Sequence, residues 1–427
     1  MTWPAARTSV GLSLLFLAVY GSCNWLTSLR TDVGTWYFEW ERLIPFVPLM
    51  ILPYMSIDLF FVVGPFLCRD RAELGTLRRR IVLAIVAAGA GFLLFPLRFA
   101  FERPTVTGWL GGVFDAFRTL DQPYNLLPSL HITLRTILVD LYARHTTGLL
   151  RGGVHVWFSL IGLSTVFTYQ HHVIDVVGGF VLAAVCFWAV RESPLTAPVV
   201  PNPRVAALYL AGCAVAVALA LVSWPWTGVL LWPAGSLLIV ATAYLGIGPG
   251  IFRKAGGRLP LSTRLLLGPC LLGQYLSLRY YRRHCGPWDE VVPNVLIGSR
   301  LSNAEATRLI RSGVTAVLDL TSEFSEASPF LGLAYCNTPI LDLTAPTPEH
   351  LQATTAFIAQ HAKTGVVYVH CKIGYSRSAA VVGAHLLATG QAANVAEAEV
   401  RLRQARPSIV IRPEAMAALH RFALAPR

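Results

Sequence analysis

Charged residues are scarce in this chain. Asp, Glu, Lys and Arg make up 14% of its 427 residues, whereas a soluble globular domain carries about 25%. The hydrophobic fraction is correspondingly high, at 54%. This balance excludes an ordinary soluble protein and indicates that much of the chain lies in a lipid bilayer.

Closely spaced cysteines are also lacking. The chain has eight cysteines, but no two of them have the C-x2-C spacing that is typical of zinc and redox sites. We therefore expect free thiols buried among apolar residues rather than a disulfide framework. We also expect neither a metal ion nor another cofactor.

The charge that is present is mostly of one sign. The formal net charge is +12, and nearly all of the positive charge is arginine. A nucleic-acid-binding protein gathers such residues beside aromatic or polar reading surfaces, but here they lie mostly between long apolar runs. This placement favours membrane flanks and anionic lipid headgroups as partners, and it excludes nucleic acid.

A helix needs about 20 apolar residues to cross the hydrocarbon core of a bilayer. The predicted spans are about 9–29, 43–67, 81–100, 129–147, 153–171, 172–190, 204–223 and 226–247. The arginine-rich segment 69–80 predicts a cytoplasmic loop, and alternation from there places the 101–128 loop and the turn at 171–172 on the outer face.

The apolar segment 259–277 is shorter and has arginines at both ends. We expect it to form a helix that lies on the cytoplasmic face of the membrane. The alternative is a further span, which would move the C-terminal domain to the other side.

From Trp288 onward the pattern of residues changes. Short β-rich runs alternate with helical ones over about 140 residues, which is typical of a small α/β domain. We therefore predict a multi-pass α-helical membrane domain followed by a small α/β domain of the cysteine-phosphatase type. The predicted ranges are a membrane domain over 1–250, a basic and partly interfacial linker over 251–287, and the α/β domain over 288–427.

The stretch VYVHCKIGYSRSAAVV holds the clearest chemistry. It places Cys371 and Arg377 six positions apart, on a loop between a predicted strand and an Ala/Val-rich helix. The N–H groups of such a loop and the following helix N-terminus bind an anion and lower the pKa of the thiol, so that Cys371 becomes a nucleophile. Arg377 can hold two phosphate oxygens, and Gly374 permits a turn that a Cβ would obstruct.

Other residues complete this predicted site. Ser378 can donate to the thiolate and ease its departure, Lys372 adds a basic group that binds phosphate, and His370 is expected to orient the loop. The reaction needs an acid for the leaving oxygen. Asp342, in LDLTAPTPEHL, is the first candidate and Asp319 the second. The alternatives are a loop cap at the aspartate and an ordinary buried thiol at the cysteine.

This loop resembles that of the cysteine-dependent protein tyrosine and dual-specificity phosphatases, and the resemblance covers about 288–427. Within that family it looks most like the mitochondrial lipid-phosphatase branch, which acts on phosphatidylglycerophosphate. The matching stretches are VLIGS, LDLTAPTPEHL, VYVHCK, SRSA and RPSIVIRP. The resemblance implies Cys371 as nucleophile, Arg377 as phosphate ligand and Asp342 as general acid. Tyr375 is a departure, because that branch often has a basic residue there.

A second group of ionisable residues lies in the predicted spans, where such residues are costly and usually functional. PSLH ends in His131, and YQHHVID contains His171 and Asp175 at positions i and i+4 of one helix face. His171 could attack a phosphorus atom and His131 could protonate the leaving group, with Arg103 of the outer loop binding phosphate. Helix–helix hydrogen bonds and a metal site are the alternatives.

This second pattern resembles the type 2 phosphatidic acid phosphatase superfamily across about 40–190. PSLH and HxxxD match two of its three signatures, and Arg103 belongs to an incomplete first one. Thr165 stands where the phosphatases of that superfamily carry an arginine. LLPSLH with HHxxxD looks closer to the inositol phosphorylceramide and sphingomyelin synthase branch. The resemblance therefore favours transfer of a phospho-alcohol headgroup between lipids over plain hydrolysis.

Together these features predict a multi-pass cell-membrane phosphatase. It would remove a monoester phosphate from a phosphorylated lipid headgroup through a phosphocysteine, and a second His/Asp site would hydrolyse phospholipid or transfer a headgroup. The alternative is a membrane-anchored phosphatase for phosphoproteins, with a structural or degenerate membrane domain. The predicted topology places the cysteine site in the cytoplasm and the histidine site on the outer face. Either the two sites act on different lipid pools, or 259–277 spans the membrane and brings both to one side.

Overall fold

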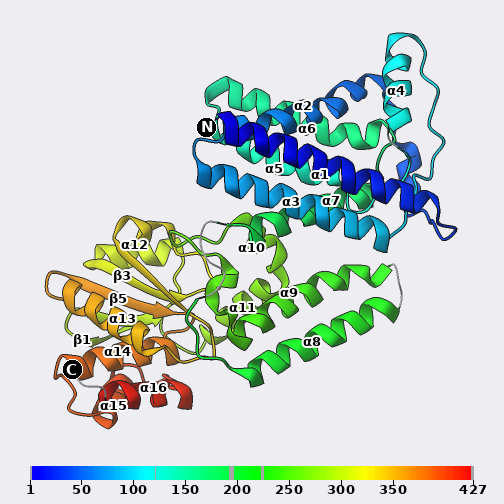
Figure 1. Cartoon of the computed structure of the whole chain (residues 1–427). Coiled ribbons are helices and arrows are strands. Elements are labelled where there is room, and N and C mark those ends of the chain that lie inside the picture. The colour runs from blue at the N-terminus through cyan, green and yellow to red at the C-terminus, as the bar shows by residue number, and fades with distance from the viewer. Residues whose placement is uncertain (1, 121, 192–196, 223–225, 425–427) are drawn as a thin grey trace. The chain divides into compact units, whose positions relative to one another are not determined.

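The computed structural model describes residues 2–120, 122–191, 197–222 and 226–424. The chain divides into two compact units, Met1–Glu192 and Ser193–Arg427. The first is helical, and the second combines helices with one five-stranded sheet (Figure 1). The prediction of a multi-pass helical region followed by a small α/β domain is confirmed.

The first unit is built from helices around one apolar core. Its helices are α1 (Thr2–Ser28), α2 (Ile51–Leu67), α3 (Arg71–Leu94), α4 (Gly108–Leu120), α5 (Leu130–Arg144), α6 (Gly148–Phe167) and α7 (Val173–Ala189), with a short 3-10 helix, η1 (Glu39–Leu43), before α2. Side chains such as Ile85, Ile137 and Phe158 are buried between α3, α5 and α6. The turn between α6 and α7 is short, as predicted, and contains both His171 and His172.

Within the described residues, five helical segments are long and apolar enough to cross a membrane: Thr2–Ser28, Pro48–Leu67, Gly148–Phe167, Pro203–Val222 and Thr227–Ile247. A sixth, Val173–Ala189, is apolar but shorter. α3 and α5 complete the set of eight predicted spans, but each of them carries several charged residues. The chain is therefore a membrane protein in which not every predicted span is uniformly apolar.

The arginine-rich segment 69–80 differs from the expectation of a loop. α3 begins within it, at Arg71, and the Asp70 side chain accepts from the Glu73 N–H at 2.8 Å. The physical reason is that Ala, Glu, Leu and Arg are good helix formers and Asp is a favourable N-cap. The predicted span over 81–100 is thus the second part of a longer helix that ends at Leu94.

The second unit contains the sheet and the remaining helices. Its strands are β1 (Trp288–Val292), β2 (Val295–Ser299), β3 (Val314–Thr321), β4 (Ala334–Ile340) and β5 (Val366–Cys371), and its helices are α8 (Pro203–Val222), α9 (Leu231–Thr242), α10 (Leu261–Leu266), α11 (Gly268–Tyr281), α12 (Asn303–Arg311), α13 (Pro348–His361), α14 (Ser376–Ala388), α15 (Val395–Ala405) and α16 (Pro413–Leu424).

The sheet has the strand order β1-β2-β5-β3-β4, with β1 antiparallel and the other strands parallel. One face packs against α13 to α16 through a large apolar core, and the other packs against α12 and the segment around Phe330 (Figure 1). β5 is the central strand, and its inner residues Val367 and Val369 are fully buried. The carboxyl ends of β2 to β5 therefore meet at one edge of the sheet.

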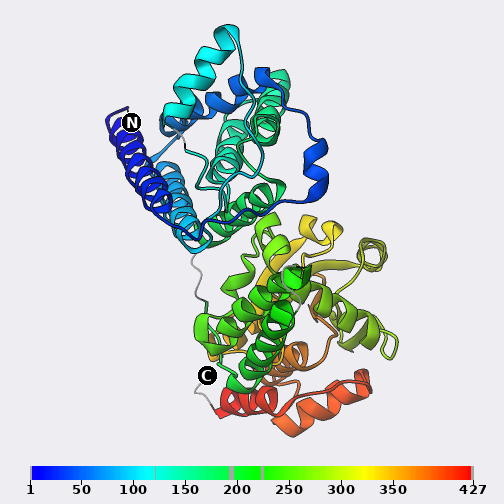
Figure 2. The same ribbon diagram turned by 90° about the vertical axis from the view of Figure 1, so that its right-hand side faces the viewer.

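α8 and α9 run side by side as an antiparallel hairpin (Figures 1 and 2). Although both are apolar, they belong to the same compact unit as the sheet. The linker that follows turns back at Ala255, which bridges to Arg258, and then forms two helices, α10 and α11, where the sequence predicted one interfacial helix over 259–277. The break lies at Leu267, the residue between them.

Candidate active sites

The first candidate site lies at the carboxyl edge of the sheet. β5 ends at Cys371, Glu323 follows β3, and Asp342 follows β4. Because these three strands are parallel and adjacent, their carboxyl ends place the three side chains at one place, as in other α/β folds.

The loop after β5 has the conformation that the sequence predicted. Gly374 has a φ of +79°, and a Cβ there would lie 2.5 Å from the carbonyl carbon of Gly298. Its N–H donates to the Cys371 sulfur at 3.3 Å. The loop therefore needs glycine at this position, both for its backbone conformation and for its close approach to β2.

Cys371 has the environment of a reactive thiol. It is 3% exposed, and burial alone would raise its pKa. The Arg377 guanidinium and the hydrogen-bonding groups of Ser378 and Ile373 outweigh burial and lower the pKa of the Cys371 thiol below its ordinary value. The predicted nucleophile, phosphate ligand and helper hydroxyl are thus brought together at one place.

Arg377 is held by a residue that sequence reasoning missed. Glu323 accepts from both terminal nitrogens of the Arg377 guanidinium, at 2.8 and 3.2 Å, and the Ile340 carbonyl accepts at 2.8 Å. Both members of this ion pair are 2% exposed. Glu323 therefore fixes the direction of the guanidinium. Its position just after a buried strand was the one feature of the sequence that could have marked Glu323 as a site residue.

The candidate acid contacts the same guanidinium. Asp342 accepts from Arg377 at 3.2 Å and from the Lys372 ammonium at 2.5 Å. Burial raises the pKa of the Asp342 carboxyl. Arg377 and Lys372 lower it by more than burial raises it, so the pKa lies below the ordinary value. Asp342 is therefore a carboxylate that neutralises part of the positive charge of Arg377 and Lys372.

A buried charge network lies behind the loop. The His370 imidazole contacts the Glu326 carboxylate at 2.6 Å, and its other ring nitrogen lies 3.3 Å from the Cys371 carbonyl. Asp319, the second candidate acid, is fully buried and accepts from Lys254 at 2.5 Å. Asp319, Glu326 and His370 are close enough to hold a metal ion, but the Lys254 ammonium already supplies a cation. Asp319 is thus buried in an ion pair with Lys254 of the linker, which is the environment of a structural residue rather than of a general acid.

This network predicts a pH-dependent stability. Burial alone would lower the pKa of His370, but Glu326 and Asp319 outweigh it and raise the pKa to about 9. An unfolded histidine has a pKa of about 6.5, so the stabilisation is complete below about pH 6.5 and is lost as the pH rises through about 9. We expect the melting temperature of the detergent-solubilised chain to fall across this window.

In His370→Asn, the fall in melting temperature between about pH 6.5 and 9 should disappear. The control is His420→Asn, at an exposed position of α16, in which the fall should remain. Differential scanning fluorimetry across the pH range measures both. An unchanged slope in His370→Asn would mean that another group causes the pH dependence.

The α8–α9 hairpin reaches this site. The Tyr244 hydroxyl donates to the Asp342 carbonyl at 2.9 Å, and the Asn202 amide donates to the Leu343 carbonyl at 2.9 Å. From α11, Gln274 accepts from the Lys372 ammonium at 2.8 Å. A cavity of about 10 Å³ remains between these elements, and its lining includes Tyr209, Val240, Tyr244, Phe252, Cys270, Gln274, Glu323 and Asp342. That volume holds about one water molecule.

The second candidate site lies in the first unit. His171 is 7% exposed, and its Nδ1 lies 3.6 Å from the Asp175 carboxylate. His131 stacks on the Tyr54 ring with centroids 4.2 Å apart and is close enough to His171 for their charges to interact. The Ser129 N–H donates to the Asp175 carbonyl at 3.0 Å, which joins the two sequence motifs. The structure therefore brings His131, His171 and Asp175 of the predicted set to one place.

The residues around this set have different roles. His172, the neighbour of His171, contacts the Glu41 carboxylate at 2.9 Å and accepts from the Ala100 N–H at 3.1 Å, so it ties η1 to α7. Sequence reasoning missed Glu41, which is 131 residues away. Thr165 is fully buried, and its carbonyl accepts from the His171 N–H. Arg103 lies half-buried in the loop between α3 and α4.

Two family models match the chain. The model described as "Dual specificity phosphatase, catalytic domain" matches residues 297–423, and the model described as "PAP2 superfamily" matches residues 49–189. The first range contains the site around Cys371, and the second contains the site around His171.

Several characterised proteins are similar to the C-terminal domain. Dual specificity protein phosphatase 12 of Mus musculus is 40% identical over 110 residues, which cover 24% of this chain and 31% of that protein. Dual specificity protein phosphatase 26 of Rattus norvegicus is 30% identical over 156 residues, 32% of this chain and 72% of that protein. Phosphatidylglycerophosphatase and protein-tyrosine phosphatase 1 of Homo sapiens is 29% identical over 152 residues, 33% of this chain and 75% of that protein.

The chain spans only about a third of the length of the first of these relatives, but about three quarters of the length of the other two. Through residues 297–423 the chain belongs to the dual specificity phosphatase family, and it joins that catalytic domain to a domain of the PAP2 superfamily.

Proposed function

We propose that this chain is a membrane-bound phosphatase that removes a monoester phosphate from a phosphorylated lipid headgroup. The proposal is supported by the reactive environment of Cys371, by the membrane-length helices in the same unit, and by the similarity to a human protein named for phosphatidylglycerophosphatase and protein-tyrosine phosphatase activity.

The residues present account for each step of this reaction. The Cys371 thiolate attacks phosphorus and forms the S–P bond, while the bond to the headgroup oxygen breaks and Asp342 supplies the proton for that oxygen. Arg377 and the loop N–H groups bind the phosphoryl oxygens. Water then attacks phosphocysteine, Asp342 takes a proton from it, and Ser378 stabilises the departing thiolate.

Substrate binding prepares the acid for its role. The carboxyl of Asp342 has a lowered pKa because it faces Arg377 and Lys372. A phosphate dianion at Arg377 neutralises the same cations and adds negative charge nearby, and both effects raise the pKa of Asp342. The acid therefore becomes protonated in the complex that needs a proton donor.

The observation that carries the lipid assignment is the position of the hairpin. Tyr244 and Asn202, at the ends of two membrane-length helices, hydrogen-bond to the backbone of the acid loop at Asp342 and Leu343. The space left beside Asp342 is small and is lined by that hairpin. A headgroup that comes from the bilayer along these helices would meet the acid loop directly, and this contact is the support for a lipid substrate.

The second candidate substrate is a phosphoprotein. It is favoured by the 40% identity to a relative named as a dual specificity protein phosphatase. The test compares kcat/KM of the full chain in vesicles for a lipid phosphomonoester and for phosphotyrosine and phosphothreonine peptides. We expect turnover of the lipid and little of the peptides. Turnover of peptides alone would replace the lipid proposal with the protein one.

Tyr244 offers a matched test of the hairpin. Tyr244→Phe removes the hydrogen bond to the Asp342 carbonyl, which is worth about 1 kcal/mol, so we expect kcat to fall by about fivefold with little change in KM. Tyr280→Phe, on the exposed face of α11, is the control. An equal effect of both variants, or a change in KM alone, would show that Tyr244 does not position the acid loop.

The site in the first unit is proposed to act on phospholipids by hydrolysis or by headgroup transfer. His171, oriented by Asp175, would attack phosphorus, and His131 would protonate the leaving group. The neutral Thr165 favours transfer, as the sequence resemblance implied. We propose, from the arginine distribution, that the cysteine site faces the cytoplasm and the histidine site faces the outer side.

A further inference from the structure

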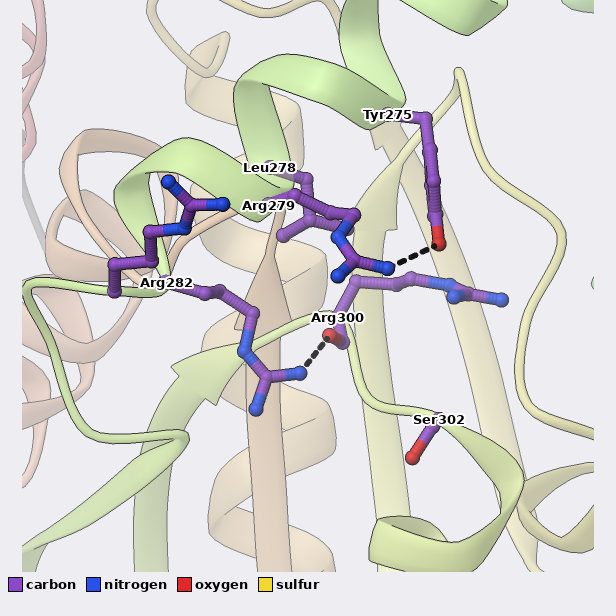
Figure 3. A pocket seen from close by; sticks show the side chains of 7 residues that line it. Tyr275, Leu278, Arg279, Arg282, Arg300 and Ser302 are labelled. Atoms are coloured by element: carbon purple, nitrogen blue, oxygen red, sulfur yellow. Dashed lines mark hydrogen bonds between the residues drawn. The ribbon is translucent and has the colours of Figure 1, made fainter.

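A basic pocket beside the catalytic loop takes no part in the proposed mechanism. It has a volume of about 370 Å³ and is lined by Tyr275, Leu278, Arg279, Arg282, Arg283, Arg300 and Ser302. Four of these seven residues are arginines. Figure 3 shows that side chains from α11 and from the segment after β2 come together here. We call this the arginine pocket.

The positive charge of the arginine pocket is only partly neutralised. Arg282 pairs with Glu305 at 2.5 and 3.0 Å. Arg279 donates to the Tyr275 hydroxyl at 3.4 Å (Figure 3). Arg300 donates to the Ser325 carbonyl. Among the described residues, Arg282 is the one member of the four with a carboxylate within 4.0 Å. The pocket would therefore stabilise a bound anion, because only one carboxylate in the described part of the chain neutralises its four guanidinium groups.

The arginine pocket is distinct from the phosphate loop but is attached to it. The Arg300 N–H donates to the Lys372 carbonyl at 3.1 Å, and Leu278 packs against Ile373 of the loop. Cys371 is not part of the lining. α11 thus turns Gln274 toward the catalytic side and Arg279 toward the pocket, so both sites share one helix.

Exposed apolar side chains lie beside the pocket on α11, and the segment before α11 is tied to the membrane-length helix Thr227–Ile247. Leu272, Leu276 and Tyr280 of α11 are 58%, 58% and 59% exposed. The Trp232 indole of α9 donates to the Leu265 carbonyl at 2.7 Å and fastens the segment before α11 to the hairpin. Exposed Leu and Tyr beside several arginines are typical of a helix at the interface of an anionic membrane.

We propose that the arginine pocket binds the phosphodiester headgroup of an anionic phospholipid of the surrounding bilayer and so holds the catalytic loop at the lipid surface. A volume of about 370 Å³ is in the range of small-molecule sites, and it exceeds the needs of a free phosphate ion. The exposed leucines beside the pocket contact the acyl chains. The binding itself is independent of the proposed function, whereas its effect on lipid turnover rests on it.

The binding test uses the full chain in a neutral detergent. Short-chain phosphatidylglycerol, short-chain phosphatidylcholine and inorganic phosphate are titrated, and native mass spectrometry counts bound lipid. The variant Arg279→Gln/Arg283→Gln should bind phosphatidylglycerol at least tenfold more weakly than wild type. The control is Arg401→Gln/Arg403→Gln, which removes the same charge from exposed ion pairs on α15 and should bind as wild type does.

Three results would overturn the pocket as a lipid site. These are unchanged binding of phosphatidylglycerol by the Arg279/Arg283 variant, equal binding of phosphatidylcholine by wild type, and displacement of the lipid by an equal concentration of inorganic phosphate. Hydrolysis of a small soluble aryl phosphate should be unchanged in both double variants, which shows that they are folded.

A second measurement separates this proposal from the proposed function. In vesicles, adding phosphatidylglycerol to phosphatidylcholine should raise turnover of a lipid phosphomonoester several-fold for wild type and not for the Arg279→Gln/Arg283→Gln variant. If the variant loses lipid binding but wild type turns over no lipid phosphomonoester in any vesicle, the pocket stands and the lipid substrate is wrong.

Discussion

Replacing Asp342 with Asn is expected to slow the dephosphorylation of an alkyl phosphate monoester by about 10²- to 10⁴-fold, the usual contribution of a general acid. An amide cannot donate the proton that an alkoxide leaving group needs. The measurement is the release of inorganic phosphate from a lipid phosphomonoester by the full chain in vesicles.

The leaving group provides the internal control for this variant. An aryl phosphate with an acidic phenol needs little protonation, so its hydrolysis should fall much less in Asp342→Asn. Glu349→Gln, an exposed residue at the start of α13, should leave both rates unchanged. An equal loss for alkyl and aryl substrates would mean that Asp342 holds the site together through Arg377 and Lys372 and is not the acid.

Replacing Cys371 with Ser should abolish turnover, with a loss of roughly 10⁴-fold or more. A serine hydroxyl is not ionised by the field that lowers the thiol pKa. Phosphate binding should persist, because Arg377 and the loop N–H groups are unchanged. Phosphate release at pH 7 and equilibrium binding of a non-hydrolysable phosphonate measure the two properties.

Two controls accompany the Cys371→Ser variant. Cys336→Ser changes a half-buried thiol of β4 and should retain activity. His171→Ala disables the second site and should also retain release of phosphate from a lipid monoester. If His171→Ala abolished that release while Cys371→Ser left it intact, the chemistry would belong to the membrane site.

The cysteine loop was predictable because its parts are contiguous. Cys371, Gly374, Arg377 and Ser378 lie within eight residues, so their spacing alone defines an anion-binding turn. The fold class was predictable for a similar reason, since long apolar runs and alternating strand and helix patterns are local properties. The fold class is confirmed, and the structure brings the four loop residues together.

The ion-pair partners of the site residues could not be predicted from the sequence, because they lie far apart along the chain. Glu323 reaches Arg377 over 54 residues, and Lys254 reaches Asp319 over 65. The position of Glu323 after a buried strand marks it as a candidate site residue but does not identify Arg377 as its partner, and nothing local marks Lys254, because the pairing depends on which strands become neighbours. The association of α8 and α9 with the sheet was missed for the same reason, since apolar composition indicates a membrane helix but not what its ends contact.

The site around His171 combines a local pattern that could be predicted with a distant partner that could not. The spacing of His171 and Asp175 predicted two residues on one helix face. α7 begins at Val173, so His171 precedes the helix, although its side chain lies 3.6 Å from the Asp175 carboxylate. The spacing could not show that the adjacent His172 is held by the distant Glu41. Of the two neighbouring histidines, His172 therefore joins η1 to α7 through Glu41, and His171 lies beside the Asp175 carboxylate.

Trapping a covalent intermediate distinguishes chemistry at Cys371 from chemistry at His171. The full chain with Ser378→Ala, which should slow breakdown of phosphocysteine, is mixed with a lipid phosphomonoester in vesicles, quenched in denaturant without acid, digested and analysed by mass spectrometry. We expect phosphate on the peptide that contains Cys371. Phosphate on a peptide containing His171, or turnover of the lipid with no phosphate on Cys371, would contradict this expectation.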